Sequence, residues 1–399
     1  FIRDRFTWLA YFMLAYYAYL QAALGPLMPF LRAELNLNYT VAGLHLSAFA
    51  LGMIIAGLTA ERLAHNWGRR RVFWGGGIGM AVGALLLVLN KLAILTISSA
   101  FLMGFLGSLL LVMIQTTLAD RHGEQRAIAL TESNVGASLS ASLAPIFIGA
   151  FERFGLDWRA ALVLAVIVLA VLAFRFGRES IPANPSAVLR VGDKTQGLPG
   201  LFWAYWSVIC LCVSVEWCLI FWGADFLEKV VGLGQINAAT MMSIFFGAML
   251  LGRIAGSRLT RLMPGTTLLL IAIGITLGGF PIFWLARFAP LNLAGLFIAG
   301  LGVANLFPLT LSVALSIASH QSDLASARIS FALGLAILIA PLGLGWTADR
   351  LNIQNAYGIV GLLLLTATTV IFLANRLAAS RALILSQVEV HQEGSTCLN

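Results

Sequence analysis

The feature that most constrains the fold of this chain is a series of twelve long apolar stretches, bounded by charged residues or by glycine and proline clusters. A helix needs about 20 predominantly apolar residues to cross the hydrocarbon core of a bilayer. A helix also satisfies every backbone polar group within its own segment, which that core requires. We therefore predict an all-α polytopic membrane protein with twelve transmembrane helices at 7–31, 39–63, 72–90, 94–118, 124–150, 158–176, 201–226, 236–259, 266–286, 291–318, 325–346 and 355–375.

The composition excludes a soluble protein. Hydrophobic residues make up 60% of the 399 residues and charged residues only 11%, whereas soluble domains carry about 25% charged residues. Three of the four cysteines share one apolar stretch without metal-ligand or redox spacing, so we interpret them as packing thiols. The sequence contains no nucleophile–base set, cofactor motif or ATPase motif. We expect no enzyme activity, no cofactor and no metal, and we expect an ion gradient to supply the energy.

The placement of the 25 Lys and Arg residues predicts the orientation of the chain. When the helices are counted from the N-terminus, most of these residues fall on the side that holds both termini. By the positive-inside rule, that side is cytoplasmic. We therefore expect a protein of the inner (plasma) membrane with both termini in the cytoplasm. The net charge of +8 follows from this topology, and we expect no nucleic-acid partner.

The chain reads as two halves that repeat each other. The longest polar interval predicts a cytoplasmic linker at 177–200 between six-helix bundles at 1–176 and 201–376, and residues 377–399 read as a flexible cytoplasmic tail. Short motifs recur in equivalent places: Ala144-Pro145 and Ala340-Pro341, Glu152-Arg153 and Asp349-Arg350, Ile55-Ala56-Gly57 and Ile254-Ala255-Gly256. Two parallel six-helix halves, each with nested inverted repeats, are the architecture of one class of transporter.

The segment after the second apolar stretch carries a motif of glycine, acidic and basic residues. It comprises Gly57, Glu61, Arg62, Gly68 and Arg69-Arg70-Arg71. This motif resembles the loop motif of the major facilitator superfamily, but five residues separate Arg62 from Gly68 where the family usually has one. Together with the repeat and Asp157-Trp158-Arg159 before the sixth stretch, the resemblance covers the whole chain. It implies a secondary transporter whose halves rock to expose a central site alternately to each side.

Two subfamilies compete for the chain. The second half resembles fucose-permease-like sugar:proton symporters in Phe246–Arg253, in Phe307-Pro308 and in the position of Glu216. The carboxylates that this permease carries in its first and fourth helices have no counterpart here. Drug:proton antiporters usually have an arginine inside the fourth helix, which 94–118 lacks, and their fifth-helix motif is present only in part.

Glu216 is an isolated acidic residue near the middle of an apolar stretch. An ionisable side chain in the membrane interior is costly unless it faces a cavity or a partner. Glu216 is therefore either a neutral carboxyl hydrogen-bonded to another helix, or a substrate ligand or proton carrier. Trp217 and Trp222 lie nearby, where they would stack on a substrate or pack against other helices.

Five charged residues near the predicted inner mouth are candidates for gating: Glu61, Arg62, Glu132, Arg253 and Arg328. The usual packing of the superfamily implies that the fifth helix meets the eighth and the eleventh meets the second. Glu132 would then pair with Arg253, and Arg328 with Glu61 or a nearby helix end, which would hold the inner mouth shut in the outward-facing state. The alternative is that each residue caps its own helix near the lipid headgroups.

Four further polar residues are candidates for lining the central cavity: Asn305, Asn134, Gln115 and Tyr19. Asn305 precedes Pro308, which frees a backbone carbonyl in its helix. Each residue either faces the cavity or forms hydrogen bonds between helices. For Tyr19, which shares a helix face with Tyr16, a lipid-facing position is the other alternative.

These observations predict a monomeric secondary active transporter of a small polar, sugar-like organic solute, coupled to protons through Glu216 and, second, Glu132. The first alternative is an efflux antiporter that exchanges amphipathic compounds for protons. The second is a membrane-bound sensor that binds without turnover. The expected partners are a small-molecule substrate, protons and the lipid bilayer.

Overall fold

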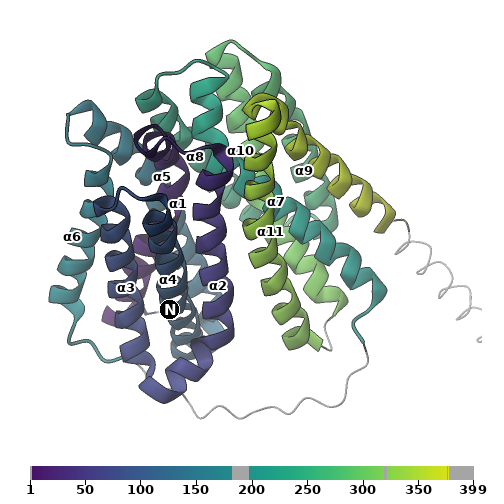
Figure 1. The fold of residues 1–399 in the computed structure, drawn as a ribbon. Coiled ribbons are helices and arrows are strands. Elements are labelled where there is room, and N and C mark those ends of the chain that lie inside the picture. The colour runs from purple at the N-terminus through teal and green to yellow at the C-terminus, as the bar shows by residue number, and fades with distance from the viewer. Residues whose placement is uncertain (1, 182–196, 319–320, 375, 377–399) are drawn as a thin grey trace, which may run out of the picture.

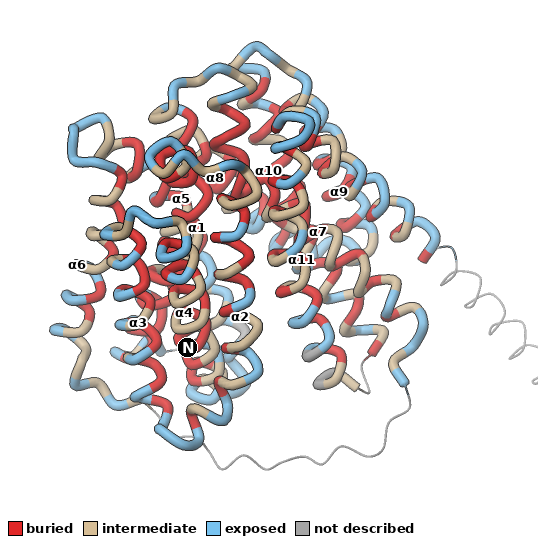
Figure 2. The backbone as a smooth tube through the Cα atoms, viewed as in Figure 1, coloured by how far each residue is buried: buried red, intermediate tan, exposed pale blue. Residues whose placement is uncertain are grey.

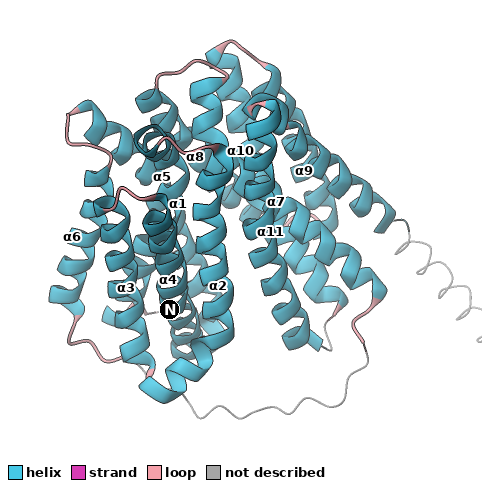
Figure 3. Cartoon of the chain, viewed as in Figure 1, coloured by secondary structure: helices cyan, strands magenta, loops and turns pink. Residues whose placement is uncertain are grey.

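The computed structural model describes residues 2–181, 197–318, 321–374 and 376 (Figure 1). These residues form helices joined by short connections and contain no strand (Figure 3), which confirms the predicted fold class. The helices are α1 (Arg5–Leu35), α2 (Tyr39–Trp67), α3 (Arg69–Leu89), α4 (Ala93–His122), η1 (Gly123–Gln125), α5 (Arg126–Arg153), α6 (Arg159–Phe176), α7 (Gly200–Lys229), α8 (Gln235–Leu259), α9 (Gly265–Leu285), α10 (Ala289–Ile317), α11 (Ser322–Leu351) and α12 (Ile353–Ala356). Beyond a turn at Tyr357, the helix of α12 continues to Ala374. Residues 182–196 of the predicted linker and the predicted tail lie outside the described residues.

The helices form two groups that stand side by side (Figure 1). We call α1–α6 the first half and α7–α12 the second half. The N-terminal end of the bundle is the end at which α1 begins and α6 ends, and the other is the opposite end. The two halves meet where α5 packs on α8, α11 on α2, and α1 on α7.

Helix α1 lies inside the protein rather than against lipid. Eleven of the described helices are long and apolar enough to cross a membrane, and α1 is not among them because its tyrosines and two prolines reduce its hydropathy. Most of its residues are nevertheless buried (Figure 2), because it packs against α4, α5, α6 and α7. Two of its tyrosines bind backbone oxygens of neighbouring helices: Tyr16 Oη donates to Gly77 O (3.2 Å) and Tyr19 Oη to Ala161 O (3.0 Å).

The connection between α2 and α3 is shorter than the sequence predicted. The five residues between Arg62 and Gly68 form a further turn of α2 instead of a loop, so the loop prediction was wrong. Gly68 alone joins the helices, with φ of 83°, a conformation that favours glycine. Directly after it, Arg69 binds Asp120 of α4 at 2.6 Å, which fixes the start of α3.

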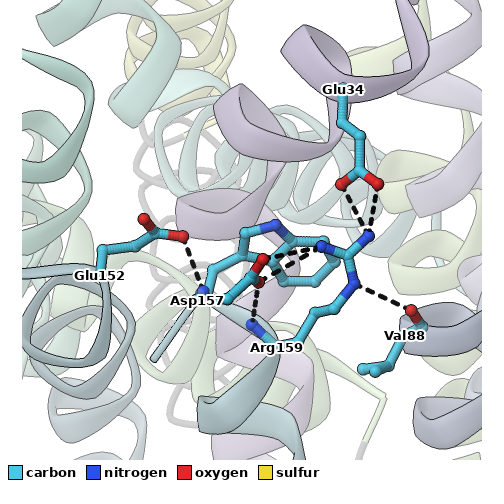
Figure 4. Close-up of polar contacts among 6 residues, drawn as sticks. Glu34, Val88, Glu152, Asp157 and Arg159 are labelled. Atoms are coloured by element: carbon cyan, nitrogen blue, oxygen red, sulfur yellow. Dashed lines mark hydrogen bonds and ion pairs between the residues drawn. The ribbon is translucent and has the colours of Figure 1, made fainter. Parts of the chain in front are cut away.

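The motif Asp157-Trp158-Arg159 before the sixth stretch ties four helices of the first half together at the opposite end (Figure 4). The guanidinium of Arg159 binds Glu34 of α1 at 2.6 Å and 2.7 Å, and donates from Nε to Val88 O of α3 at 2.9 Å. On its other side it binds Asp157, while Glu152 of α5 accepts from Trp158 N at 2.7 Å. The motif therefore holds the first half together as a unit at this end.

Close helix contacts depend on glycine between α2 and α4. A Cβ atom at Gly104 would lie 2.1 Å from Phe49 O, and one at Gly52 would lie 2.5 Å from Phe105 N. Small residues allow helix backbones in a membrane to approach this closely and to pack by van der Waals contact.

We expect Gly104→Ala to destabilise the first half by about 1–3 kcal/mol, because the added methyl group forces the backbones of α2 and α4 apart. The measurement is the apparent melting temperature of the purified protein in detergent. The matched control is Gly57→Ala on α2, where an added Cβ meets no atom within 4 Å. Equal melting temperatures for the two variants would contradict the packing argument.

Candidate functional site

A cavity of about 610 Å³ lies between α5, α8 and α10. Its volume falls in the range of about 300–1,000 Å³ that is usual for small-molecule sites. The described lining residues are Leu130, Thr131, Asn134, Val135, Ser138, Leu250, Arg253, Ile254, Gly256, Ser257, Thr260, Gly265, Asn305, Phe307, Pro308, Leu309 and Ser312. Most of them come from the first half of α5 and the last turns of α8 and α10, and Gly265 begins α9, so the cavity lies toward the N-terminal end.

The walls of the cavity combine apolar side chains with a few polar groups. Leucine, valine, isoleucine and phenylalanine side chains line every wall, and serine, threonine and asparagine supply hydroxyl and amide groups. Among the described lining residues, Arg253 alone carries a charge. The cavity reaches the surface at the N-terminal end, where Thr131, Ser257 and Thr260 are exposed.

Arg253 joins the two halves at this cavity. Its Nη1 donates to Ser138 Oγ of α5 at 2.8 Å, and its Nη2 lies 3.7 Å from Glu216 Oε1 of α7. Ser138 in turn donates to Asn134 O at 2.9 Å, so its hydroxyl hydrogen is committed to its own helix. The Glu216 side chain is 14% exposed and that of Arg253 is 43% exposed. A single guanidinium therefore connects α8 to both a carboxylate and the opposing half.

The structure brings four of the predicted site residues together: Glu216, Arg253, Asn134 and Asn305. The two asparagines line the cavity, but their amide groups already donate to backbone oxygens, Asn134 Nδ2 to Leu130 O (2.7 Å) and Asn305 Nδ2 to Gly252 O (2.8 Å). Asn305 also fixes the packing of α10 on α8, because a Cβ at Gly256 would lie 2.0 Å from its Oδ1.

The remaining predicted binding residues are not among those that line this cavity. Trp222 is fully buried at the opposite end, where its Nε1 donates to Pro341 O at 2.7 Å. Tyr19 faces α6 inside the first half. Trp217 is partly buried and Gln115 is exposed.

The predicted gating pairs are not formed in this structure. Glu132 binds Arg3 through two bonds of 2.7 Å and 2.8 Å and accepts from Tyr11 Oη at 3.0 Å, all within the first half. Within the described part of the chain, Glu61, Arg62 and Arg328 make no ion pair. Their role in a state with a closed N-terminal end stays a prediction.

A second network near Glu132 anchors the start of α1. Asp4 caps the helix by accepting from Thr7 N at 2.8 Å, and Arg121 Nε donates to its other oxygen at 2.6 Å. Burial acts to raise the pKa of the Asp4 carboxyl, but the hydrogen bonds from Thr7 and Arg121 outweigh it and hold the pKa below the ordinary aspartate value.

Within the described residues, no group of three or more His, Cys, Asp or Glu side chains is placed to hold a metal ion.

The opposite end contains charged residues that sequence reasoning missed. Arg32 of α1 forms an ion pair with Asp225 of α7, whose side chain is completely buried. The guanidinium of Arg32 also lies 3.5 Å from the centre of the Tyr39 ring. Asp349 of α11 accepts hydrogen bonds from Tyr39 N and Thr40 N, both at 2.7 Å, at the start of α2.

These contacts close the opposite end between the two halves. The Tyr39 ring packs edge-on against Trp222 at 5.5 Å, Ser47 Oγ donates to Leu338 O at 2.7 Å, and Arg153 binds Asn237. One signal was available in the sequence: Asp225 is a second acidic residue within the predicted seventh helix. Its partner is not apparent from the sequence, because Arg32 lies just beyond the predicted first helix at 7–31.

Comparison with known proteins places this geometry in a family. The family model of the Major Facilitator Superfamily matches residues 7–322. An uncharacterised MFS-type transporter of Yersinia pestis is 25% identical over 354 residues, covering 86% of this chain and 89% of that protein. The multidrug resistance protein MdtL of Shigella flexneri serotype 5b is 25% identical over 358 residues, covering 85% of this chain and 89% of that protein.

Solved structures share the fold. A bacterial homologue of the human lysosomal transporter Spinster, in an inward-facing and occupied conformation, superposes with a TM-score of 0.74 at 14% identity, covering 94% of this chain and 97% of that one. A POT family transporter in complex with a conjugated peptide superposes with a TM-score of 0.76 at 15% identity, covering 93% and 96%. The chain therefore belongs to the Major Facilitator Superfamily and is a membrane transporter rather than an enzyme.

Proposed function

We propose that this transporter moves a small organic solute by alternating access and couples that movement to protons through Glu216. The observation that carries the proposal is the contact of Glu216 with Arg253 beside a cavity that lies between the two halves. A carboxylate in the membrane interior is costly and marks a functional site by default. Here it has one charged partner and lies where the two halves meet.

The conformation supports alternating access. The described polar contacts between the halves gather at the opposite end, apart from Arg253 with Ser138. The cavity reaches the surface at the N-terminal end, where Thr131, Ser257 and Thr260 are exposed. We propose that this end, which carries most of the Lys and Arg residues, faces the cytoplasm. The structure then corresponds to an inward-facing state.

Proton coupling follows from the surroundings of Glu216. Arg253 and Cys212 are the titratable groups that interact with it within the described residues. If Arg253 moves away, the carboxylate has no counter-charge in the low-dielectric interior, and protonation becomes its least costly state. Movement of Arg253 would thus be linked to proton uptake.

The cavity lining bears on the solute class. A sugar needs several hydrogen-bond donors and acceptors, yet one amide N–H of each of Asn134 and Asn305 is already bound to a backbone oxygen. The apolar walls favour a solute with an apolar body over the sugar-like solute that the sequence predicted. Efflux of amphipathic compounds in exchange for protons is the second candidate, which the similarity to MdtL also supports.

We expect Glu216→Gln to abolish accumulation driven by a pH gradient while sparing exchange of solute, because the amide cannot carry the proton. The measurement is uptake and counterflow in proteoliposomes. Glu124→Gln, in the exposed turn η1, removes an acidic residue away from the cavity and should leave both unchanged. Concentrative uptake by Glu216→Gln at the level of the unmodified protein would contradict the proposal.

Asp225→Asn should favour opening of the opposite end. Breaking a buried ion pair costs about 3–5 kcal/mol because the remaining charge is left buried. In the variant this charge is Arg32, and it becomes hydrated when this end opens to water, so the open state is favoured. A cysteine at Ser47, which is buried within the closure, should then react at least about tenfold faster with an impermeant maleimide, a change that corresponds to 1.4 kcal/mol.

The matched control for this labelling experiment is Glu34→Gln. Glu34 also binds an arginine at the opposite end, but its partner Arg159 belongs to the same half. If Glu34→Gln accelerates labelling as much as Asp225→Asn does, the ion pair between the halves does not hold this end closed.

The predicted contact between Glu61 and Arg328 can be tested by charge exchange. Their helices, α2 and α11, pack against each other between the halves. We expect Glu61→Arg and Arg328→Glu each to impair transport, because like charges then meet when the N-terminal end closes. The double variant should restore the rate of uptake. A double variant no better than the worse single variant would exclude the pair.

A further inference from the structure

We propose that the transported solute is an organic anion with an apolar body, and that its anionic group binds Arg253 in competition with Glu216. The inference rests on the proposed function and names the substrate class of the same site. The anionic group is a carboxylate, phosphate or sulfonate, and its source is a water-soluble solute rather than a lipid headgroup.

The first support is that Arg253 is only loosely engaged by its carboxylate. The ion pairs of Arg3 with Glu132, Arg159 with Glu34 and Arg69 with Asp120 have contacts of 2.6–2.7 Å. The distance from Arg253 to Glu216 is 3.7 Å, a length shared by the exposed pair of Arg5 with Glu179. Charge-assisted hydrogen bonds are usually about 2.7–2.9 Å long. The guanidinium therefore retains capacity for a second acceptor.

The second support is that the remaining N–H donors of Arg253 are available on the side of the cavity. A guanidinium has five N–H donors, and one of those of Arg253 is bound to Ser138. The side chain lines the cavity and is 43% exposed. A ligand carboxylate can accept two parallel hydrogen bonds from such a fork. A ligand cation in the cavity would meet the guanidinium rather than the carboxylate, because Arg253 is among the described lining residues and Glu216 is not.

The third support is the remainder of the cavity. Leu130, Val135, Ile254 and Phe307 provide apolar surface within the same space. A solute with an anionic group at one end and an apolar body at the other matches this distribution better than a fully polar one. The cavity volume of about 610 Å³ accommodates a small organic acid.

The competition gives the coupling a charge balance. Before binding, Arg253 and Glu216 neutralise each other. When the solute anion takes over Arg253, Glu216 loses its counter-charge and takes up one proton from water. The occupied site then holds Arg253 with the anion and a neutral Glu216 carboxyl, so its net charge is again zero. A proton and a monovalent anion accordingly travel together, without net movement of charge.

Ligand sets that differ only in charge test the inference. Benzoate, phenylacetate and hexanoate, each with its neutral amide and its amine, would be titrated by calorimetry into the purified protein in nanodiscs of zwitterionic lipid. We expect at least one acid to bind about tenfold or more tightly than its amide and its amine. Absence of a preference for the anion in all three sets would overturn the inference.

Variants test whether the preference for anions arises from competition between the anion and Glu216 for Arg253. Arg253→Gln should abolish the preference, and Glu216→Gln should strengthen anion binding because the competing charge is removed. Arg258→Gln removes an exposed positive charge from the same helix outside the cavity lining, and it should keep the preference. Weaker anion binding in Glu216→Gln, or equal losses in Arg253→Gln and Arg258→Gln, would contradict the competition.

Further outcomes distinguish a soluble ligand from a lipid headgroup, and anion binding from proton coupling by Glu216. If nanodiscs with anionic lipid eliminate the binding of acids in an Arg253-dependent way, the ligand is a lipid headgroup and the inference fails. If the unmodified protein shows no preference for the anion but Glu216→Gln uncouples uptake from the pH gradient, this inference is overturned and the proposed function stands. If the unmodified protein prefers the anion and Glu216→Gln still accumulates solute in a pH gradient, anion binding is supported and proton transfer by Glu216 is overturned.

Discussion

The structure depends on how the carboxylates inside α7 are neutralised. Glu216 and Asp225 both lie in this buried helix, and each is paired with an arginine from a different helix, Arg253 of α8 and Arg32 of α1. Charges in a membrane interior are tolerated when they pair or face a cavity. One pair sits at the cavity and the other closes the opposite end. A rise of 1.5 Å per residue places them about 13 Å apart along α7, so one helix joins the cavity to the closure.

The closure of the opposite end contains two corresponding contacts, one contributed by the end of α5 and one by the end of α11. Arg153 at the end of α5 binds Asn237 at the start of α8, and Asp349 at the end of α11 binds the start of α2. Arg153 and Asp349 both belong to the repeated motif of an acidic residue followed by arginine, Glu152-Arg153 and Asp349-Arg350. The residue types differ, but each places a charged side chain from the last turn of one helix on the first turn of a helix in the other half. The symmetry of the fold is thus retained in the position of the contact rather than in its chemistry.

The sequence was sufficient for what depends on local composition. Apolar length set the number of helices and their ends within about one turn, because hydrocarbon thickness fixes how long a spanning helix must be. The five residues after Arg62 were misinterpreted, because an insertion can extend a helix as readily as a loop. Glu216 and Arg253 could be singled out as charges in apolar surroundings. The position of Trp222 and the partner of Arg32 could not, because both depend on how α1, α2, α7 and α11 pack in three dimensions.

The energetics of the two pairs constrain how the states exchange. In the proposed alternating-access cycle, opening the opposite end would separate Arg32 from Asp225, and loss of such a buried contact costs several kcal/mol unless both groups become hydrated. Two states that interconvert during transport can differ by only a few kcal/mol. Contacts formed when the N-terminal end closes must therefore offset the loss. Arg3 with Glu132 cannot supply this offset, since it lies within the first half. The contribution has to come from groups that face each other across α2 and α11 or α5 and α8, which is where Glu61, Arg328 and the solute bound at Arg253 would act.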